Sequence, residues 1–237
     1  MARPRSAGFD GQREQILAAA AALFAQRGYA GTSMNDLAAA CGVSKATLYH
    51  YVRDKQQLLA QISTAHVARL EALVAEVAAE VAAERLLPEA HLRRLIERFT
   101  AAYAGAQHEH RVLTENQRHL DAVQREAVRA GQRRVVQAFT EAVTALGPQA
   151  PLPSKALTML LFGMLNWTFT WWKPVGSISH AELAPVVSDV FIGGLRSLAA
   201  PVAAARATTT ATSAAAATTS LRSRPRGRAP AHGVLRG

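Results

Sequence analysis

Many side chains between residues 44 and 55 of this chain can form hydrogen bonds, and six of them are candidates for contacts with a ligand. They are Ser44, Lys45, Thr47, Tyr49, His50 and Lys55. Hydroxyl, ammonium and imidazole groups can donate to phosphate oxygens and to the acceptor atoms on the edges of nucleic-acid bases. The sequence shows no nucleophile–base set, no phosphate loop and no well-spaced metal ligands. We therefore expect a binding protein rather than an enzyme.

Two short helices joined by a tight turn would position these groups. Gly42 can adopt the positive φ that a sharp turn between helices requires, and Ser44 follows it as a helix N-cap. Ala38 is small where the second helix must approach the first. Apolar contacts between the helices are supplied by Leu37, Val43, Leu48 and Tyr51. The pattern predicts a helix-turn-helix over Met34 to Arg53, whose second helix enters a DNA major groove.

The residue types divide the expected DNA contacts into two groups. Lys45 and Thr47 lie in the first turn of the second helix, where base edges are read. Phosphate contacts are expected from Ser44, Tyr49, His50 and Lys55, and from Thr32 and Ser33 at a helix N-terminus. Ala46 completes the candidate contact set, whereas Tyr51 is interpreted as a core aromatic.

A family resemblance covers about 50 residues, from Arg13 to Leu59. The stretch AALFAQRGYAGTSMNDLAAACGVSKATLYHYVRDKQQLL resembles the N-terminal DNA-binding domain of TetR/AcrR-type transcriptional regulators. The shared features are the LF…GY…TS segment, the GVS…LYHYV segment and the DK..LL start of the next helix. The resemblance implies a cytoplasmic, all-α repressor with about nine helices, whose C-terminal domain binds a small molecule and forms a homodimer.

Hydrophobic periodicity and caps predict the helices. The first covers residues 13–27 and ends at Gly28, and the second is opened by Thr32 or Ser33 with Asp36. Later helices are expected over residues 54 to the early 80s, from 88 to a break near 105, 108–116, 118–146 with Val123 facing inward, 154–172, and from a Ser179–Glu182 capping box onward. The expected organisation is a flexible arm (1–11), a DNA-binding domain (12–58), a ligand-binding and dimerisation domain (59–200) and a disordered tail (201–237).

The resemblance implies a small-molecule cavity in the C-terminal domain. Candidate lining residues are Phe99, Tyr103, Gln107, Arg111, Arg118, Phe162, Trp167 and Phe169. The segment LNWTFTWWKPVGSISHAEL resembles the corresponding junction in family members that respond to acyl-CoA thioesters, so the effector is expected to be small and apolar or of acyl-CoA type. The cations available for a CoA group are Arg93, Arg94, Arg98, Arg111 and Arg118. No cofactor is expected, and the spacing of His108, His110, His119 and Asp121 is poor for a shared metal.

A single helix-turn-helix contacts only a few base pairs, so useful specificity requires two copies on a palindromic operator. Helices 154–172 and beyond 179 are apolar on more than one face, which favours a bundle formed with a second subunit. The candidate interface residues are Gly163, Val187, Val190, Phe191, Gly194 and Leu195. The same excess of apolar residues, in the run Ala156 to Trp172, is at the short limit for a membrane span, and we expect a buried or interface helix there instead.

The formal charge of +10 is concentrated at the C-terminus. Beyond Asp189 there is no acidic residue but there are seven arginines, at positions 196, 206, 222, 224, 226, 228 and 236. Most of the chain is therefore nearly neutral, and its charge says little about its partners. An alternative function remains open, in which the arginine-rich tail makes this a non-regulatory nucleic-acid-binding protein. The single cysteine, Cys41, cannot form an internal disulfide and fits a reducing compartment.

Overall fold

The computed structural model describes residues 7–147, 150–172 and 178–199. The expected disordered tail and the first part of the expected N-terminal arm lie outside these ranges. The described chain is all-helical. Its elements are α1 (Ala7–Arg27), α2 (Met34–Ala40), α3 (Lys45–Tyr51), α4 (Lys55–Glu84), α5 (Pro88–Gly105), α6 (Gln107–Asn116), the 3₁₀ helix η1 (Gln117–His119), α7 (Ala122–Ala145), α8 (Ser154–Trp171) and α9 (His180–Ala199).

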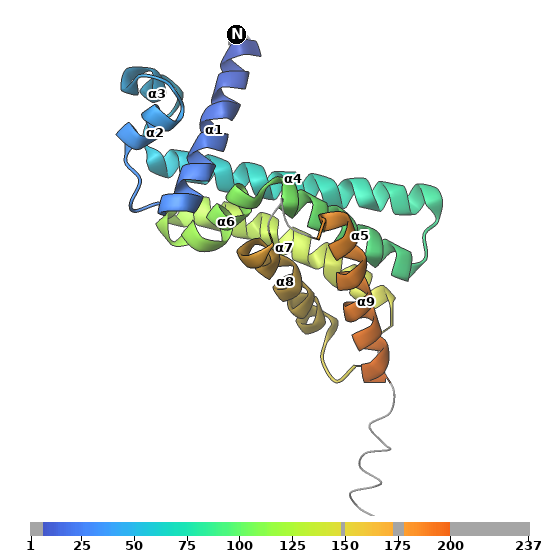
Figure 1. The fold of residues 1–237 in the computed structure, drawn as a ribbon. Helices are drawn as coiled ribbons and strands as arrows, with labels where there is room; N and C mark the ends of the chain where they lie inside the picture. Colours follow the sequence, from blue (N-terminus) through green and yellow to red (C-terminus); the bar gives the residue numbers. More distant parts are fainter. Residues whose placement is uncertain (1–6, 148–149, 173–177, 200–237) are drawn as a thin grey trace, which may run out of the picture.

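The helices form a small head and a larger body that share one long helix (Figure 1). Helices α1, α2 and α3 lie together at one end, and α4 runs from this head along the length of the body. Helices α5 to α9 lie below α4 in this view. Because α4 belongs to both parts, a displacement of α4 within the body also displaces the head.

Several helix ends carry the caps that the sequence predicts. Ser33 and Asp36 form a reciprocal capping box at the start of α2, and Ser179 and Glu182 exchange the same hydrogen bonds before α9. Asp54 caps α4 through the backbone N–H of Gln57. Such caps satisfy backbone groups that have no partner within the helix, which is why these boundaries can be located from sequence.

Two helix starts differ from expectation. Helix α1 begins at Ala7, so residues 7 to 11 are helical rather than part of a flexible arm, and the ring of Phe9 stacks on Tyr51 with centroids 4.6 Å apart. The helix expected over 118–146 is interrupted after η1 and restarts at Ala122, where Asp121 and Gln124 form a capping box. Val123 therefore lies in a first turn and is 81% exposed, so its expected inward position is wrong.

Two apolar clusters support the head and the body separately. The head cluster joins Ile16 and Phe24 of α1, Leu37 of α2, Leu48 of α3 and Leu58 of α4. The body cluster is formed mainly by α5, α7, α8 and α9, with Leu70 and Val77 of α4. Val112 and Leu113 of α6 belong to the head cluster, so α6 supports the head directly from the body.

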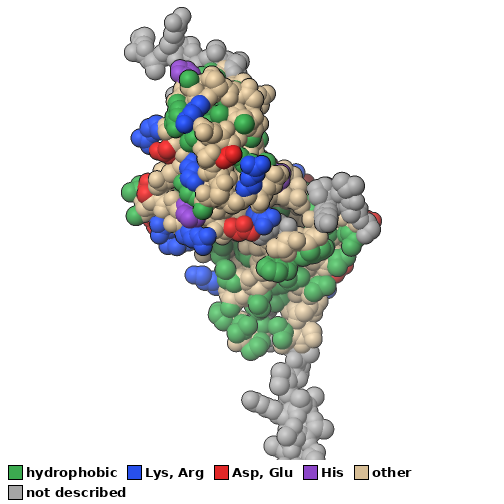
Figure 2. Space-filling model, turned by 60° about the vertical axis from the view of Figure 1, so that its left-hand side comes forward, with side chains coloured by type: hydrophobic (Ala, Val, Ile, Leu, Met, Phe, Trp, Pro, Cys, Tyr) green, Lys and Arg blue, Asp and Glu red, His purple; other side chains and the backbone are tan. Residues whose placement is uncertain are grey.

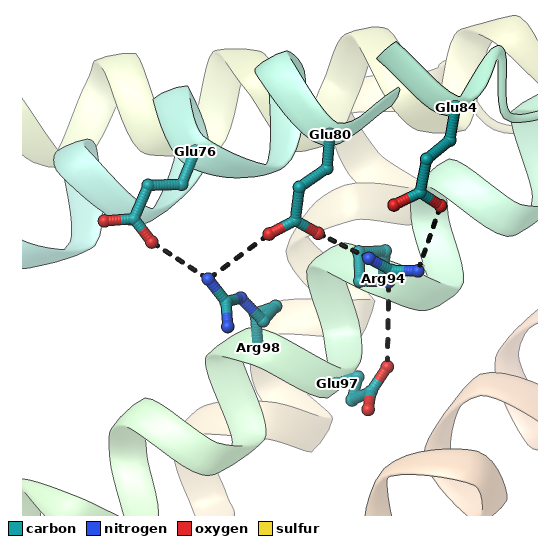
Figure 3. A network of polar contacts seen from close by, with 6 residues as sticks. All are labelled: Glu76, Glu80, Glu84, Arg94, Glu97 and Arg98. Carbon is teal, nitrogen blue, oxygen red and sulfur yellow. Dashed lines mark hydrogen bonds and ion pairs between the residues drawn. The ribbon is translucent and has the colours of Figure 1, made fainter. Parts of the chain in front are cut away.

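A network of ion pairs ties the distal half of α4 to α5 (Figure 3). Arg98 contacts Glu76 and Glu80 at 2.9 and 3.4 Å. Arg94 contacts Glu80 and, at 3.6 Å, Glu84. Partly exposed pairs contribute little singly but more as a network with shared partners. This end of α4 is therefore held in place more firmly than by apolar packing alone.

Candidate nucleic-acid interface and internal cavity

The turn between α2 and α3 sets the exposure of the α3 side chains. Gly42 has φ of 64°, and the N–H of Val43 donates to the carbonyl of Ala38 at 3.0 Å. The Ser44 hydroxyl accepts the N–H of Thr47 at 3.0 Å and contacts the Thr47 hydroxyl at 2.8 Å. The hydroxyl groups of Ser44 and Thr47 thus support each other at the start of α3.

Helix α3 turns one face to the core and leaves the other open. Leu48 is fully buried and Tyr51 packs against the head cluster, consistent with the interpretation of Tyr51 as a core aromatic. The side chains on the open face are exposed, and Tyr49 retains 46% of its surface. This face carries Ser44, Lys45, Ala46, Thr47, Tyr49 and His50.

Two of the expected phosphate contacts instead have partners within the protein. Thr32 is 1% exposed, and its hydroxyl donates to the carbonyl of Gly28 at 2.9 Å. The Lys55 ammonium donates to the carbonyls of Tyr29 and Thr32 at 2.8 and 3.0 Å and lies 4.4 Å from the centroid of the Tyr29 ring. Both residues therefore position the head, whereas Ser33 remains exposed at the start of α2.

Tyr29 joins the head to the body through a second aromatic contact. Its ring stacks on that of His119 in η1, with centroids 4.6 Å apart. Desolvation, Arg118 and Lys55 all lower the pKa of His119, so the stacked imidazole is held in its uncharged form. Burial, followed by the charge of Asp54, raises the pKa of Tyr29. Three segments meet at this tyrosine: the start of α4, the loop that follows α1, and the helix η1.

A cavity of about 240 Å³ extends into the body between α4, α5, α6, α7 and α8 and opens to the surface beside Thr114 and Met159. Its lining residues are Val67, Leu70, Tyr103, His110, Leu113, Thr114, Gln132, Val135, Val136, Met159, Phe162 and Asn166. A dry cavity of ~150 Å³ can already hold a benzene molecule, so this one is large enough for a small organic ligand. Two of its walls, α4 and α6, also contact the head.

Two buried histidines bridge α4 and α6 beside this cavity. Nε2 of His66 and Nδ1 of His110 are 3.3 Å apart, and the Tyr103 ring stacks on His110 with centroids 3.8 Å apart. Burial, aided by the charges of His110 and Arg69, lowers the pKa of His66 to about 3. Burial lowers the pKa of His110 to about 4. Both imidazoles are therefore uncharged at neutral pH.

The structure brings only part of the candidate ligand set to this cavity. Tyr103 and Phe162 line it, whereas Phe99 is buried in the body core and Gln107 lines smaller hollows nearby. Trp167 is 66% exposed. The side chain of Phe169 lies outside the described residues. Sequence reasoning missed the lining residues on α4 and α7, because an apolar stripe does not reveal which members border empty space.

The arginines expected to serve a CoA group have other partners. Arg94 and Arg98 belong to the α4–α5 network, and Arg93 pairs with Glu89 and Asp189. Two more candidates are exposed, with Arg111 paired to Glu115 and Arg118 donating to His119. None of these five lines the cavity. Among the described residues, no cluster of histidine, cysteine and acidic side chains is placed to hold a metal ion.

The candidate dimer residues divide between two faces of α8 and α9. Val187, Phe191 and Leu195 are at most 7% exposed and pack in the subunit's own core, so they do not form an outer surface. Val190 is 60% exposed, and Gly163 and Gly194 also face outward. The apolar residues left exposed on the two helices include Leu160, Trp167, Trp171, Val186, Val190 and Leu198.

These exposed side chains form a coherent surface. On α8 they recur at intervals of seven and four residues, and on α9 at intervals of four and eight, which places each set on one helix face. Figure 2 shows hydrophobic side chains gathered over the lower part of the molecule, where α8 and α9 lie in Figure 1. An apolar surface of this kind marks an interaction site in most proteins. In the described part of the chain, no helix has the length and hydropathy that a membrane span requires.

The fold and the exposed α3 face define a helix-turn-helix DNA-binding protein joined to a larger helical body. Residues 16–62 match the family described as bacterial regulatory proteins, tetR family, and residues 85–195 match the tetracyclin repressor-like C-terminal domain. The chain belongs to the TetR family of transcriptional regulators, which is not a family of enzymes.

Individual relatives agree with this assignment. A TetR-family regulator from Bordetella parapertussis has a TM-score of 0.70 and 35% identity over 76% of this chain and 93% of its own. AibR, solved with isovaleryl coenzyme A and operator DNA, has a TM-score of 0.66 and 27% identity over 76% and 97%. The transcriptional repressor KstR2 of Rhodococcus jostii is 25% identical over 81% of this chain and 95% of its own.

Proposed function

We propose that this protein is a dimeric repressor that reads a palindromic operator with α3 and is released by a small molecule in the body cavity. The observation that carries the proposal is the position of α4, which begins beside the α3 reading face and lines the cavity with Val67 and Leu70. A ligand that fits only one position of α4 shifts the protein toward the state in which α4 holds that position.

The DNA contacts of this repressor come from the open face of α3. Lys45 and Thr47 read base edges, while Ser44, Tyr49 and His50, with Ser33 of α2, contact phosphates. The base contacts distinguish one DNA sequence from another, whereas the phosphate contacts contribute similar affinity for every sequence. Thr32 and Lys55 support this face from behind through their hydrogen bonds to the loop after α1.

We expect Lys45→Ala to weaken operator binding about ten- to a hundredfold, because one specific contact contributes about 1–3 kcal/mol. Tyr49→Ala should weaken binding to all sequences more uniformly. Gel-shift titrations of operator and scrambled DNA measure both effects. Lys55→Met serves as a contrast, since it should lower thermal stability together with affinity. If Lys45→Ala and Tyr49→Ala both bind operator like the unaltered protein, α3 is not the reading helix.

The second copy binds through the exposed apolar face of α8 and α9. Gly163, Gly193 and Gly194 have no atoms within 4 Å of where a side chain would begin, so a partner helix can approach closely there. A bundle of two helices from each subunit is the simplest packing for such a surface. It would also place two reading heads on one DNA duplex.

We expect Trp167→Glu to produce a monomer, because a charge in the centre of an apolar interface loses its hydration without gaining a partner. Analytical ultracentrifugation measures the change, and operator binding should fall with it. Val123→Glu is the matched control, since Val123 is also exposed and apolar but lies on α7. Unchanged association of the Trp167 variant would place the dimer contact elsewhere.

The effector is a small apolar molecule or the acyl part of a CoA thioester. The cavity walls are mainly apolar, and AibR, a structural relative, was solved with isovaleryl coenzyme A. Operator release by a panel of acyl-CoA thioesters, alcohols, ketones and free acids tests this part of the proposal. A protein that binds operator tightly and responds to no compound of the panel contradicts ligand-controlled repression.

A further inference from the structure

The lining of the body cavity contains no formal charge. None of the described lining residues is Lys, Arg, Asp or Glu. The two titratable residues are Tyr103 and His110, and burial raises the pKa of Tyr103 and lowers that of His110 to about 4. At neutral pH every side chain that borders this space is therefore uncharged.

Most of the polar groups in the lining already have partners. The Thr114 hydroxyl donates to the backbone carbonyls of His110 and Arg111 at 3.1 and 3.0 Å. The side-chain oxygen of Gln132 accepts from Gln117 at 3.2 Å. The side-chain oxygen of Asn166, by contrast, is buried without a hydrogen-bond partner in the described part of the chain.

This composition acts against charged ligands. An ionised carboxylate or ammonium loses its hydration on entering an apolar space, and only a countercharge or several hydrogen bonds restore that loss. Two of the arginines considered for a charged group, Arg94 and Arg98, are engaged with glutamates of α4 (Figure 3) and do not border the cavity. A hydroxyl or amide N–H loses far less hydration and can be satisfied by a single amide oxygen.

We propose that the body cavity selects an uncharged, largely apolar molecule carrying a hydroxyl or amide group that donates to Asn166, and that it rejects carboxylates and ammonium ions. This inference rests on the proposed function, because it names the ligand class of the cavity that controls α4. An acyl chain of a thioester meets the charge requirement only if the phosphates of its CoA group stay outside.

Three probes of equal chain length test the selection by charge. These are n-octanol, octanoate and n-octylammonium, titrated into the full-length protein at neutral pH by isothermal calorimetry, with operator release as a second readout. The expected result is that n-octanol binds at least about tenfold more tightly than either ion, the ratio that about 1.4 kcal/mol produces. Equal or tighter binding of octanoate overturns the proposal, and so does failure of all three to bind.

The pH dependence of the acid probe sharpens this result. Octanoate should bind better as the pH falls toward its own pKa, because the protonated acid is uncharged while His110 also remains uncharged. An octanoyl-CoA arm distinguishes the two sources of a neutral chain. Binding of octanoyl-CoA as tight as that of n-octanol indicates a thioester, and its exclusion indicates a free neutral molecule; both outcomes support the uncharged cavity.

Three variants assign the selection to particular residues. Asn166→Leu should weaken n-octanol binding about tenfold, by loss of one hydrogen bond, whereas Thr114→Val should leave it nearly unchanged because that hydroxyl has backbone partners. Gln132→Lys adds a cation to the lining at a partly exposed polar residue of α7, away from the α8 and α9 surface. It should raise octanoate affinity at least tenfold while n-octylammonium stays excluded. Unchanged octanoate binding in this variant contradicts selection by charge.

The outcomes separate this inference from the proposed function. Operator release by octanoate with no response to n-octanol overturns the ligand class and leaves ligand-controlled repression standing. Failure of Lys45→Ala to weaken operator binding overturns the reading helix and leaves the cavity chemistry untouched.

Discussion

We expect the protein to lose stability steeply as the pH falls from 6.5 toward 4, with His66 and His110 responsible. Their pKa values in the folded protein are about 3 and about 4, against 6.5 for an ordinary histidine. Above pH 6.5 both imidazoles are neutral in the folded and unfolded chains, and neither affects stability. Below pH 6.5 the unfolded chain binds protons at these histidines that the folded protein does not bind, so the free energy of unfolding decreases.

The size of the effect follows from linkage. Each histidine lowers the free energy of unfolding by about 1.4 kcal/mol per pH unit while only the unfolded chain is protonated. For His110 this amounts to about 3 kcal/mol before the folded protein also begins to bind protons near its own pKa. Arg69, which faces His66 and lowers its pKa further, prevents earlier protonation. The neighbouring Tyr103 carries no charge in this range.

Urea unfolding at pH 7 and at pH 5 measures this loss. The double variant His66→Gln, His110→Gln should have a much flatter dependence on pH, since glutamine can keep a hydrogen bond but cannot titrate. His108→Gln is the matched control, because His108 is an exposed histidine on the same helix as His110. The same steep slope in the double variant would show that other groups govern acid unfolding.

Gly131→Ala should destabilise the protein by about 1–3 kcal/mol and weaken operator binding. A side-chain carbon added at Gly131 of α7 would lie 2.4 Å from Cγ1 of Val67 on α4 and 3.3 Å from a carboxylate oxygen of Glu71. Val67 is β-branched and buried, so few χ1 rotamers are open to it in a helix, and overpacking of this kind has the stated cost. The strain is expected to push α4 away from α7, which moves the reading head.

A second substitution tests this explanation. Val67→Ala opens the space that the new methyl group needs. The double variant should therefore bind operator more tightly than the sum of the two single effects predicts. Gly11→Ala is the control, because no atom lies within 4 Å of the position of its side chain. Chemical denaturation and operator titration read out stability and coupling separately. Full operator affinity in Gly131→Ala, despite lower stability, would exclude this contact from the coupling.

Much of the fold could be predicted because its boundaries are local signals. The capping boxes at Ser33 and Ser179 and the N-cap at Asp54 fix helix starts through neighbours three residues away. The break before α7 is also capped, by Asp121, yet the apolar residue that follows it suggested a continuous helix. A single valine is weak information on periodicity, since apolar side chains often remain on the surface.

The site was harder to predict because it depends on which faces meet. Helix α9 has adjacent apolar stripes, and only packing on α5 shows that Val187 faces the core and Val186 faces outward. The cavity is likewise formed by residues from five helices, and nothing in the spacing of Leu70, Gln132 or Asn166 marks them as neighbours. From sequence, Lys55 is predicted to be a surface cation. Only the structure shows that its ammonium group donates to the carbonyls of Tyr29 and Thr32.

The ion pairs between α4 and α5 fix one end of a long helix and leave the other end free to move further. They clamp α4 near Glu80, while its other end, at Lys55, lies about 38 Å away at 1.5 Å per residue. A rigid lever of that length converts a rotation of about 5° into a displacement of about 3 Å at its free end. Successive base pairs are ~3.4 Å apart, so in the proposed repressor a tilt of this size would carry α3 almost one base pair out of register.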